Sequence, residues 1–309
     1  MNAVTEAAQL DQSKVGLYNK FNVTRTDGSS EPGGKHHGDE YFVLNLTTDK
    51  HVRPALTAYA KSCAGEFPAL AADLRAICQA MQKNEFVPVP ETTLPDGTVV
   101  PAFHVGKYFS GSGDDGQLVI NASATPWTDI NYYDAVAAAK AAGLNLITEL
   151  QALAIAHDIA NVGANWSGGA VGVGNLKRGL HKGSVDEAQP GDFVPDDAEE
   201  DRWFTFSNGS QICDAAGNLY TWVHDNVQGD EQGIMAKPFA DNSPSITTAP
   251  FPSMEKGVGW QPKVGTDWSG GALIRGGFWY SGGGAGAFYL GGGWPDSESD
   301  CVGFRCTKE

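Results

Sequence analysis

Long apolar runs and clusters of basic residues are both missing from this 309-residue sequence. Because no run of 18 apolar residues occurs, membrane insertion is not expected. The chain has 37 Asp and Glu against 21 Lys and Arg, a formal net charge of −16. Nucleic-acid binding requires clustered Lys and Arg to neutralise phosphates, so no nucleic-acid partner is expected. The opening MNAVTEAAQLDQSK also lacks the basic and apolar regions of a signal peptide, and none is predicted.

Cysteine is scarce. The sequence has five cysteines, an odd number, and no two of them have a CxxC spacing, which argues against a disulfide framework and a structural zinc site. Motifs typical of nucleophilic catalysis and of phosphate binding are missing too. GxSxG does not occur, and the glycine runs lack a following Lys-Ser or Lys-Thr. No catalytic residue is therefore assigned. The five cysteines are Cys63, Cys78, Cys213, Cys301 and Cys306.

The first hundred residues have the pattern of a small α/β domain. Two β-favouring segments, residues 21–26 and 41–46, flank a loop rich in turn formers and predict two strands. Apolar residues at helical spacing then predict helices at residues 55–63 and 70–81.

A proline-rich segment, residues 86–103, follows the predicted helices. Such a composition favours an extended linker or an edge strand over a helix. We place the domain boundary there, which gives an N-terminal domain of residues 1–101 and a C-terminal domain of residues 102–309.

The C-terminal domain begins with two predicted helices and continues into loops. Residues 132–142 and 148–159 have helical periodicity, and Thr148 with Gln151 has the pattern of a capping box. His157, near the end of the second helix, is interpreted as a favourable C-terminal cation. Beyond residue 161 glycine, tryptophan and asparagine dominate, so loops are expected to outweigh regular structure.

Two short strands are predicted within the loop-rich part. Residues 220–223 alternate apolar and polar side chains after a Gly217-Asn218 turn. Residues 273–274 begin another strand. It is followed by Arg275, whose forked guanidinium suits binding to loop carbonyls or to a carboxylate.

Four motifs follow one another along the chain: TPWTDINYYDAVAAAKAAGLNLITELQALAIA (125–156), GNLYTWV (217–223), RGGFW (275–279) and GFRC (303–306). In this order they resemble formylglycine-generating-enzyme-like domains, a branch of the C-type lectin fold, and they span about two thirds of the chain. The resemblance implies an α+β, C-type-lectin-like, loop-rich domain with two helices and small twisted sheets.

Oxidising members of that family carry two cysteines between RGG and GFRC, which bind copper and oxidise a substrate cysteine. Between these motifs the present sequence has Cys301 alone, and thiolate redox chemistry needs both sulfurs. The resemblance therefore implies a protein that is not an enzyme and has no cofactor. An oxidase of the formylglycine-generating type that uses another site remains an alternative.

Calcium binding is left open. The family strand has Glu where this chain has Thr221, and that region binds calcium in some enzymes. Asp214, Asn218 and Asp225 are oxygen donors in this region, so calcium is possible here.

The tail from residue 275 onward is most similar to a non-enzymatic branch, which comprises phage tail receptor-binding proteins and variable proteins diversified by retroelements. Their tails resemble RGG-x-W…AG-x-F…P…GFR, and the fixed residues of this pattern occur here. No asparagine follows Asn242, as expected if asparagine codons had been rewritten. The resemblance implies a scaffold of Trp222, Arg275, Trp279, Phe288, Phe304 and Arg305. It implies a ligand-binding set of Phe278, Tyr280, Ser281, Gly284, Tyr289, Gly291, Gly293, Trp294, Asp296, Ser297, Glu298, Ser299, Asp300 and Cys301, whose aromatic and small residues resemble an adaptable paratope.

The function implied is that of a phage-type tail adhesin that binds a host-surface ligand. Expected partners are a host cell-surface protein or glycan and other virion tail proteins, with residues 1–101 serving attachment or assembly. A homotrimer is expected, because multivalency compensates for weak single sites. The protein would be made in the bacterial cytoplasm and located in the virion tail. A structural virion decoration protein, with the aromatic tail as a subunit interface, is a further alternative.

Overall fold

The computed structural model describes residues 21–46, 49, 51–81, 84–113 and 116–309. The chain divides into two compact units, Met1–Met81 and Gln82–Glu309. None of the helices in the described residues combines the length and the apolar character that a bilayer crossing requires.

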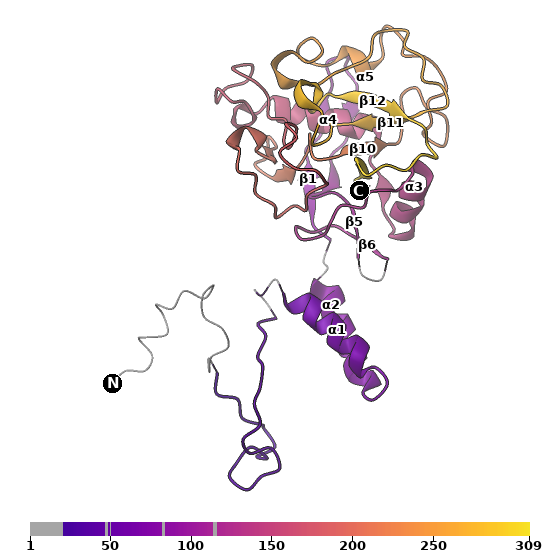
Figure 1. The fold of residues 1–309 in the computed structure, drawn as a ribbon. Helices are drawn as coiled ribbons and strands as arrows, with labels where there is room; N and C mark the ends of the chain where they lie inside the picture. Colours follow the sequence, from indigo (N-terminus) through magenta and orange to yellow (C-terminus); the bar gives the residue numbers. More distant parts are fainter. Residues whose placement is uncertain (1–20, 47–48, 50, 82–83, 114–115) are drawn as a thin grey trace. The chain divides into compact units, whose positions relative to one another are not determined.

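The N-terminal unit is built on two helices (Figure 1). α1 (Val52–Cys63) and α2 (Pro68–Met81) form where the periodicity predicts them, and they pack against each other. Thr57 Oγ1 donates a hydrogen bond to Cys78 Sγ at 3.7 Å across this contact. Pro68 is the first residue of α2, where its fixed φ suits a helix and its missing N–H leaves no bond unmade.

Neither of the two predicted N-terminal strands forms. Residues 21–26 and 41–46 contain no strand in the described part of the chain, and the side chain of Phe42 is 74% exposed. A β-favouring segment becomes a strand when another strand pairs with it and one of its faces is covered. Neither condition is met by the described residues, so the α/β character expected of this region is replaced by a pair of helices.

The division between the units lies after Met81, earlier than the boundary predicted at residue 101. β1 (Phe86–Val89) pairs antiparallel with β4 (Phe103–Gly106) inside the C-terminal unit. β1 is an edge strand of its sheet, which explains how it accommodates Pro88. The proline-rich segment is thus an edge of the C-terminal unit rather than a linker.

Two four-stranded sheets organise the C-terminal unit (Figure 1). The first is antiparallel and has the order β1, β4, β14 (Cys306–Lys308), β7 (Asn145–Leu146). The last strand therefore lies between strands formed much earlier in the chain. The second sheet has the order β12 (Leu290–Gly293), β11 (Ala272–Arg275), β10 (Tyr220–Val223), β13 (Val302–Phe304). In it β10 and β13 run parallel and the other pairs are antiparallel.

Short elements complete the unit between long loops. The remaining strands form three two-stranded hairpins, and the remaining helices are single turns. They are β2 (Thr92–Thr93) with β3 (Val99–Val100), β5 (Gly111–Ser112) with β6 (Leu118–Val119), β8 (Trp203–Thr205) with β9 (Gln211–Cys213), α5 (Pro244–Thr247), and the 3₁₀ turns Gly163–Asn165, Ala198–Glu200, Glu255–Gly257 and Gly282–Gly284.

The two longer helices of this unit begin at the caps that the sequence provides. α3 (Tyr132–Ala141) starts after Asn131, whose side chain accepts a bond from the Asp134 amide. α4 (Glu149–Ala160) starts at Thr148, and the capping box with Gln151 is fully formed. Both helices are confirmed.

His157 is not the cation that its position near the end of α4 predicts. It is buried, its Nε2 lies 2.9 Å from Thr248 Oγ1, and its ring meets the ring of Phe288 edge-on at 4.8 Å. Burial lowers its pKa to about 4. The ring is therefore neutral at pH 7, because packing against the core outweighs the attraction of the helix terminus.

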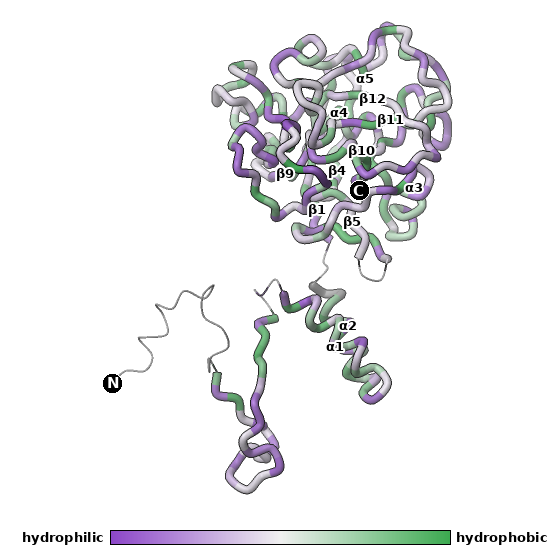
Figure 2. The backbone as a smooth tube through the Cα atoms, viewed as in Figure 1, coloured by the Kyte–Doolittle hydropathy of each residue, from purple (hydrophilic) through white to green (hydrophobic). Residues whose placement is uncertain are grey.

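The α+β class is confirmed for the C-terminal unit, which combines helices with small sheets and long loops. Strands from the two ends of the unit pair in one sheet, while the loop-rich half contributes the second sheet. α4 is buried along most of its length between apolar side chains from both halves. Figure 2 shows hydrophobic segments through the middle of the unit and more hydrophilic ones along its outer loops.

Candidate functional site

The C-terminal tail is fixed to the sheet by buried charge. Arg275, at the end of β11, donates hydrogen bonds to both carboxylate oxygens of Glu149. Its Nε donates to Oε2 at 2.8 Å, and its Nη2 donates to Oε1. Its Nη1 also donates to the carbonyl oxygen of Phe288 at 3.2 Å, and Nη2 to that of Ser245 at 3.3 Å. Glu149 and Arg275 are both buried. The predicted role of Arg275 as a clamp on a carboxylate and on loop carbonyls matches these contacts.

Arg305 fixes the end of the tail in a similar way. Its guanidinium donates to the carbonyls of Gly106, at 3.0 Å, and Asp214, at 2.8 Å. It also lies over the Phe109 ring, 4.2 Å from the centroid. The other residues predicted as scaffold are buried as well, namely Trp222, Trp279, Phe288 and Phe304.

Six aromatic rings in successive contact extend along the second sheet and around its β12 edge. We call them the aromatic row: Trp268, Trp260, Tyr289, Tyr220, Phe278 and Trp279. Successive ring centroids are 6.4, 6.2, 5.1, 5.0 and 5.2 Å apart. Trp260 lies at the β12 edge, because its carbonyl accepts a hydrogen bond from the Leu290 amide. Each such ring pair adds about 0.5–1.5 kcal/mol beyond its area burial, so the contacts stabilise the positions of the rings relative to one another.

Two exposed aromatic residues flank the row. Tyr280 is 72% exposed and Trp294 is 70% exposed. Tyr280 follows the Arg275 end of β11, and Trp294 follows the Gly293 end of β12. Because Arg275 pairs with Leu290 and Ala272 with Gly293, the two residues leave the ladder at opposite ends. The residues predicted from sequence to bind the ligand are thus spread out, with Tyr280 beyond one end of the β11–β12 ladder and Trp294 beyond the other.

Glycine is what allows Tyr280 to lie where it does. Its ring covers Gly183, where an added Cβ would come within 2.5 Å of the ring. Nearby, Ser281 Oγ accepts a hydrogen bond from the Phe278 amide at 2.9 Å and donates to the Tyr220 hydroxyl at 3.3 Å. Ser281 therefore positions two rings of the aromatic row.

The other residues predicted to bind the ligand divide into two groups. The exposed ones lie between β12 and β13: Asp296, Ser297, Glu298 and Asp300. The less exposed ones are Gly284, Gly293, Ser299 and Cys301, which are half-buried, and Gly291, which is buried.

Gly291 is a correction to the predicted surface. It lies in β12 opposite Ile274, and an added Cβ would meet the Tyr289 hydroxyl at 2.8 Å. Cys301 also turns inward, with its Sγ 3.0 Å from Ser299 Oγ and its side chain packed against the core. β-sheet alternation and core packing direct these two positions away from a ligand.

A groove lies at the Trp294 end of the aromatic row. Its volume is about 320 Å³. The ring of Trp268 covers the backbone of Gly292, where an added Cβ would come within 3.0 Å of the indole. We call it the tryptophan groove, and it is lined by Asp267, Trp268, Ser269, Gly271, Gly292, Gly293 and Trp294.

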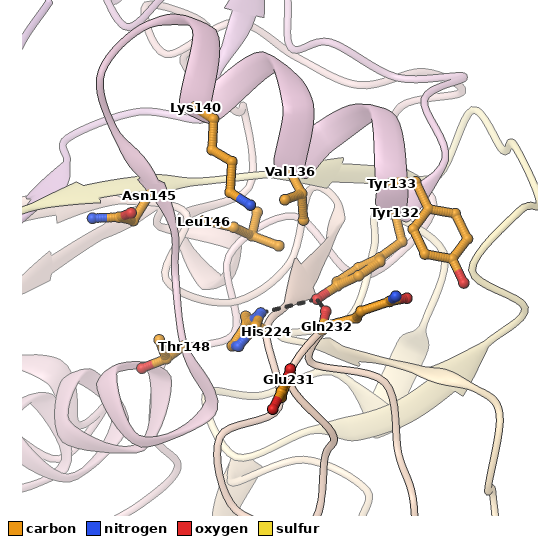
Figure 3. A pocket seen from close by; sticks show the side chains of 10 residues that line it. All are labelled: Tyr132, Tyr133, Val136, Lys140, Asn145, Leu146, Thr148, His224, Glu231 and Gln232. Atoms are coloured by element: carbon orange, nitrogen blue, oxygen red, sulfur yellow. Dashed lines mark hydrogen bonds between the residues drawn. The ribbon is translucent and has the colours of Figure 1, made fainter.

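A second hollow, of about 480 Å³, is lined by α3, by β7 and by the chain after β10 (Figure 3). The Tyr132 hydroxyl donates to the Gln232 carbonyl at 2.7 Å and lies 3.2 Å from His224 Nδ1. Since the hydroxyl hydrogen is used on Gln232, Nδ1 of His224 is the donor to Tyr132. Burial lowers the pKa of His224. Lys140 points into the hollow, so polar groups and one cation surround an apolar wall, as in a small binding pocket.

The thiols of the C-terminal unit are not activated. Cys213, Cys301 and Cys306 are free, and burial raises the pKa of each, that of Cys306 to about 11. Reactive cysteines have lowered pKa values and some exposure. In the part of the chain that the structure describes, no group of three or more His, Cys, Asp or Glu is placed to hold a metal ion.

The three oxygen-donor residues that the sequence offers for calcium binding form hydrogen bonds or ion pairs with other groups. Asp214 forms an ion pair with Arg202 at 2.6 Å, and both are buried. Asn218 Nδ2 donates to the same Asp214 carboxylate at 2.9 Å. Asp225 instead accepts from the backbone amides of Val227 and Gln228. The guanidinium of Arg202 thus supplies the positive charge next to Asp214.

Sequence reasoning did not find Trp260, Asp267 and Trp268. They come from GWQPKVGTDWSGG (259–271), a loop without helical or strand periodicity. The available signal was the density of tryptophan between glycines, because such residues stay ordered in a loop only when they pack together.

No protein-family model and no curated protein matches the sequence. Among solved structures, PvdO from Pseudomonas aeruginosa is similar over 74% of this chain and 95% of its own, with 15% identity and a TM-score of 0.38. Treponema denticola variable protein 1 is similar over 72% of this chain and 91% of its own, with 12% identity and a TM-score of 0.38.

The Major Tropism Determinant U1 variant matches over 72% of this chain, with 14% identity and a TM-score of 0.34. The match spans 55% of that longer protein. At such identities and TM-scores these proteins carry nothing about the function of this chain.

Proposed function

We propose that the chain is a receptor-binding protein of the phage-tail type, which attaches to a host-surface protein or glycan through its C-terminal unit. The observation that carries the proposal is the exposed pair Tyr280 and Trp294, which lie at the two ends of the aromatic row. Large exposed aromatic side chains on a fixed backbone are typical of binding hot spots, since little entropy is lost on contact.

The chemistry of the tail favours binding over oxidation. An oxidase of the formylglycine-generating type needs a pair of reactive thiols, and Cys301 has no second cysteine beside it in the tail before Cys306. The pKa values of both thiols are raised by burial. A thiolate at neutral pH requires the opposite shift.

The N-terminal unit supports the second half of the proposal, which is attachment to other virion tail proteins or to further copies of this chain. Phe42, Tyr59 and Phe67 are large apolar residues that are all more than half exposed. Exposed apolar surface of this kind is typical of protein interfaces. A homotrimer in the tail is the assembly we propose, since several weak sites acting together give firm attachment.

Binding of the labelled full chain to a panel of bacterial strains tests the proposal. We expect Tyr280→Ala and Trp294→Ala each to lower the apparent affinity at least about tenfold, as hot-spot truncations do. Val194→Ala is the control, because it truncates an 80% exposed apolar side chain of the same unit that lies outside the tail and outside the proposed assembly surface.

Circular dichroism of all three variants would exclude unfolding as the cause. Unchanged binding by both tail variants would contradict the proposed surface. Loss of particle assembly with retained cell binding would favour the decoration protein instead.

A further inference from the structure

The tryptophan groove combines three kinds of group around one small space. Trp294 presents its indole to solvent, Trp268 forms a second indole face, and the backbone of Gly292 and Gly293 lies between them without side chains. Its volume of about 320 Å³ is at the lower end of the range for small-molecule sites, about 300–1,000 Å³.

Trp268 is held in place from two sides. Its ring stacks on Trp260 at 26° between planes, and it meets the Phe239 ring edge-on at 5.5 Å. Glycine at position 292 allows the indole to lie against the strand, because a Cβ there would come within 3.0 Å of the ring and force it to shift slightly. The Trp268 wall of the groove therefore exists before a ligand arrives, and binding does not have to order that wall.

The carboxylate of Asp267 gives the groove a fixed hydrogen-bond acceptor. Its Oδ1 accepts from the amide of Ser269 at 2.9 Å and from its hydroxyl at 2.6 Å. Both bonds end on Oδ1, so among the described residues Oδ2 remains available as an acceptor. The same two bonds lower the pKa of Asp267, which keeps the group ionised at neutral pH.

These groups match the two sides of a sugar ring. The C–H face of a pyranose is apolar and carries slight positive charge, which suits the negative π face of an indole. Its hydroxyls are donors, and an ionised carboxylate accepts from neighbouring hydroxyls with short, strong bonds. Asp296 and Glu298 follow Trp294 closely in the chain and add negative charge, which disfavours an acidic sugar or an acidic peptide.

We infer that the tryptophan groove binds a neutral hexopyranose unit of a host-surface glycan, stacked on Trp294 and Trp268 and hydrogen-bonded to Asp267. This inference rests on the proposed function for the cell-surface location of the ligand, and it selects glycan over protein. The Tyr280 end of the aromatic row then contacts the rest of the receptor.

The test uses the full chain on an array of neutral bacterial polysaccharides and their oligosaccharides. We expect at least one glucose-, galactose- or mannose-containing glycan to bind, and Trp294→Ala and Asp267→Asn to weaken that binding at least tenfold. Val194→Ala is the control, because it truncates a large apolar side chain of the same unit that is 80% exposed and lies outside the groove and the tail, and it should leave oligosaccharide binding unchanged. Trp294→Tyr should retain part of the binding, since it keeps a ring to stack on.

Cells that bind the full chain are treated in parallel with periodate, which cleaves vicinal diols of sugars, or with proteinase. Loss of binding after periodate alone supports the inference. Loss after proteinase alone, with no glycan bound on the array, overturns it and leaves the proposed receptor-binding function intact. Glycan binding in the groove without binding to any cell would support the groove and contradict the cell-surface role. A glycan that binds the Trp294→Ala variant equally well would overturn the assignment to this groove.

Discussion

Two buried arginines fix the backbone from which the exposed residues project. Arg275 and Arg305 use their forked donors on carboxylate and carbonyl oxygens that would otherwise be buried without partners. A buried charge pair is costly to form, and it is still more costly to break on one side. The exposed Tyr280 and Trp294 therefore depend on residues that no ligand touches.

Replacing Arg275 with Met should lower the free energy of unfolding by about 3–5 kcal/mol, because the buried Glu149 carboxylate loses its cation. Urea denaturation at pH 7 measures this. The double variant that adds Glu149→Leu should lose less than Arg275→Met alone, since no unpaired charge remains. A loss below about 1 kcal/mol for the single variant would contradict a buried ion pair.

His157 should make the stability depend on pH. Burial lowers its folded-state pKa to about 4 from its ordinary 6.5, so the unfolded chain takes up the proton first as the pH falls. The stability that the neutral ring contributes is complete above pH 6.5 and is lost between pH 6.5 and pH 4, by up to about 3 kcal/mol.

Denaturation at pH 7, 6, 5 and 4 of the wild type and of His157→Gln measures this term. Burial also lowers the pKa values of His181 and His224, so the difference between the two proteins isolates His157. Parallel pH profiles of the two proteins would show that His157 does not titrate in this range.

Single residues could be predicted from sequence where their chemistry left few choices. A forked guanidinium beside glycines had to hold carbonyls or a carboxylate, and Arg275 does. His157 could not be read in this way, because its charge depends on burial by Phe288, a residue far along the chain.

At the scale of the elements, Gly284 and Gly286 lie close together in the tail but differ in whether the structure has room for a side chain. A Cβ on Gly286 would lie 2.4 Å from the carbonyl carbon of Val258, which is backbone and cannot move away cheaply. A Cβ on Gly284 would meet nothing within 4 Å. This difference matches the tail pattern, in which the residue at 286 is fixed and the residue at 284 is free to change.

Gly286→Ala should therefore destabilise the chain by about 2 kcal/mol or more, whereas Gly284→Ala should change stability by less than about 0.5 kcal/mol. Thermal unfolding of the two variants side by side tests the pair. Equal effects would mean that the backbone at residues 257–259 adjusts to the added methyl group.

Helices were more predictable than strands in this chain. α4 has its periodicity within a helix of 12 residues and its capping box begins at Thr148, directly before that helix, so local information was enough. The prediction of the N-terminal strands was wrong, because a strand needs a partner that sequence alone does not identify. The aromatic row could not be predicted for the same reason, since contacts such as Tyr220 with Phe278 join strand β10 to a loop far along the chain.

At the scale of the whole molecule, the unit boundary decides which fragment folds. A fragment of residues 82–309 keeps every strand of both sheets, whereas a fragment of residues 102–309 loses β1, β2 and β3. The shorter fragment also loses four buried core side chains, Val87, Val89, Leu94 and Val100. Each contributes about 1.5–3 kcal/mol by burial.

We expect the fragment of residues 82–309 to be soluble and to melt as the C-terminal unit does in the full chain, and the fragment of residues 102–309 to be unfolded or aggregated. Calorimetry and light scattering of both fragments test this. The longer fragment should also lose self-association if the N-terminal unit carries assembly. Identical melting of the two fragments would return the boundary to residue 101.

The strand β14 has a consequence for how the protein is made. It occupies an interior place in its sheet, between β4 and β7, although it lies far beyond both of them in the sequence. β4 and β7 are not paired with each other. The edge that each will pair with β14 therefore stays unpaired while more than 150 intervening residues are translated. The C-terminal unit thus cannot complete its fold before residues 306–308 have been synthesised, and until then its exposed strand edges are the natural target for a chaperone.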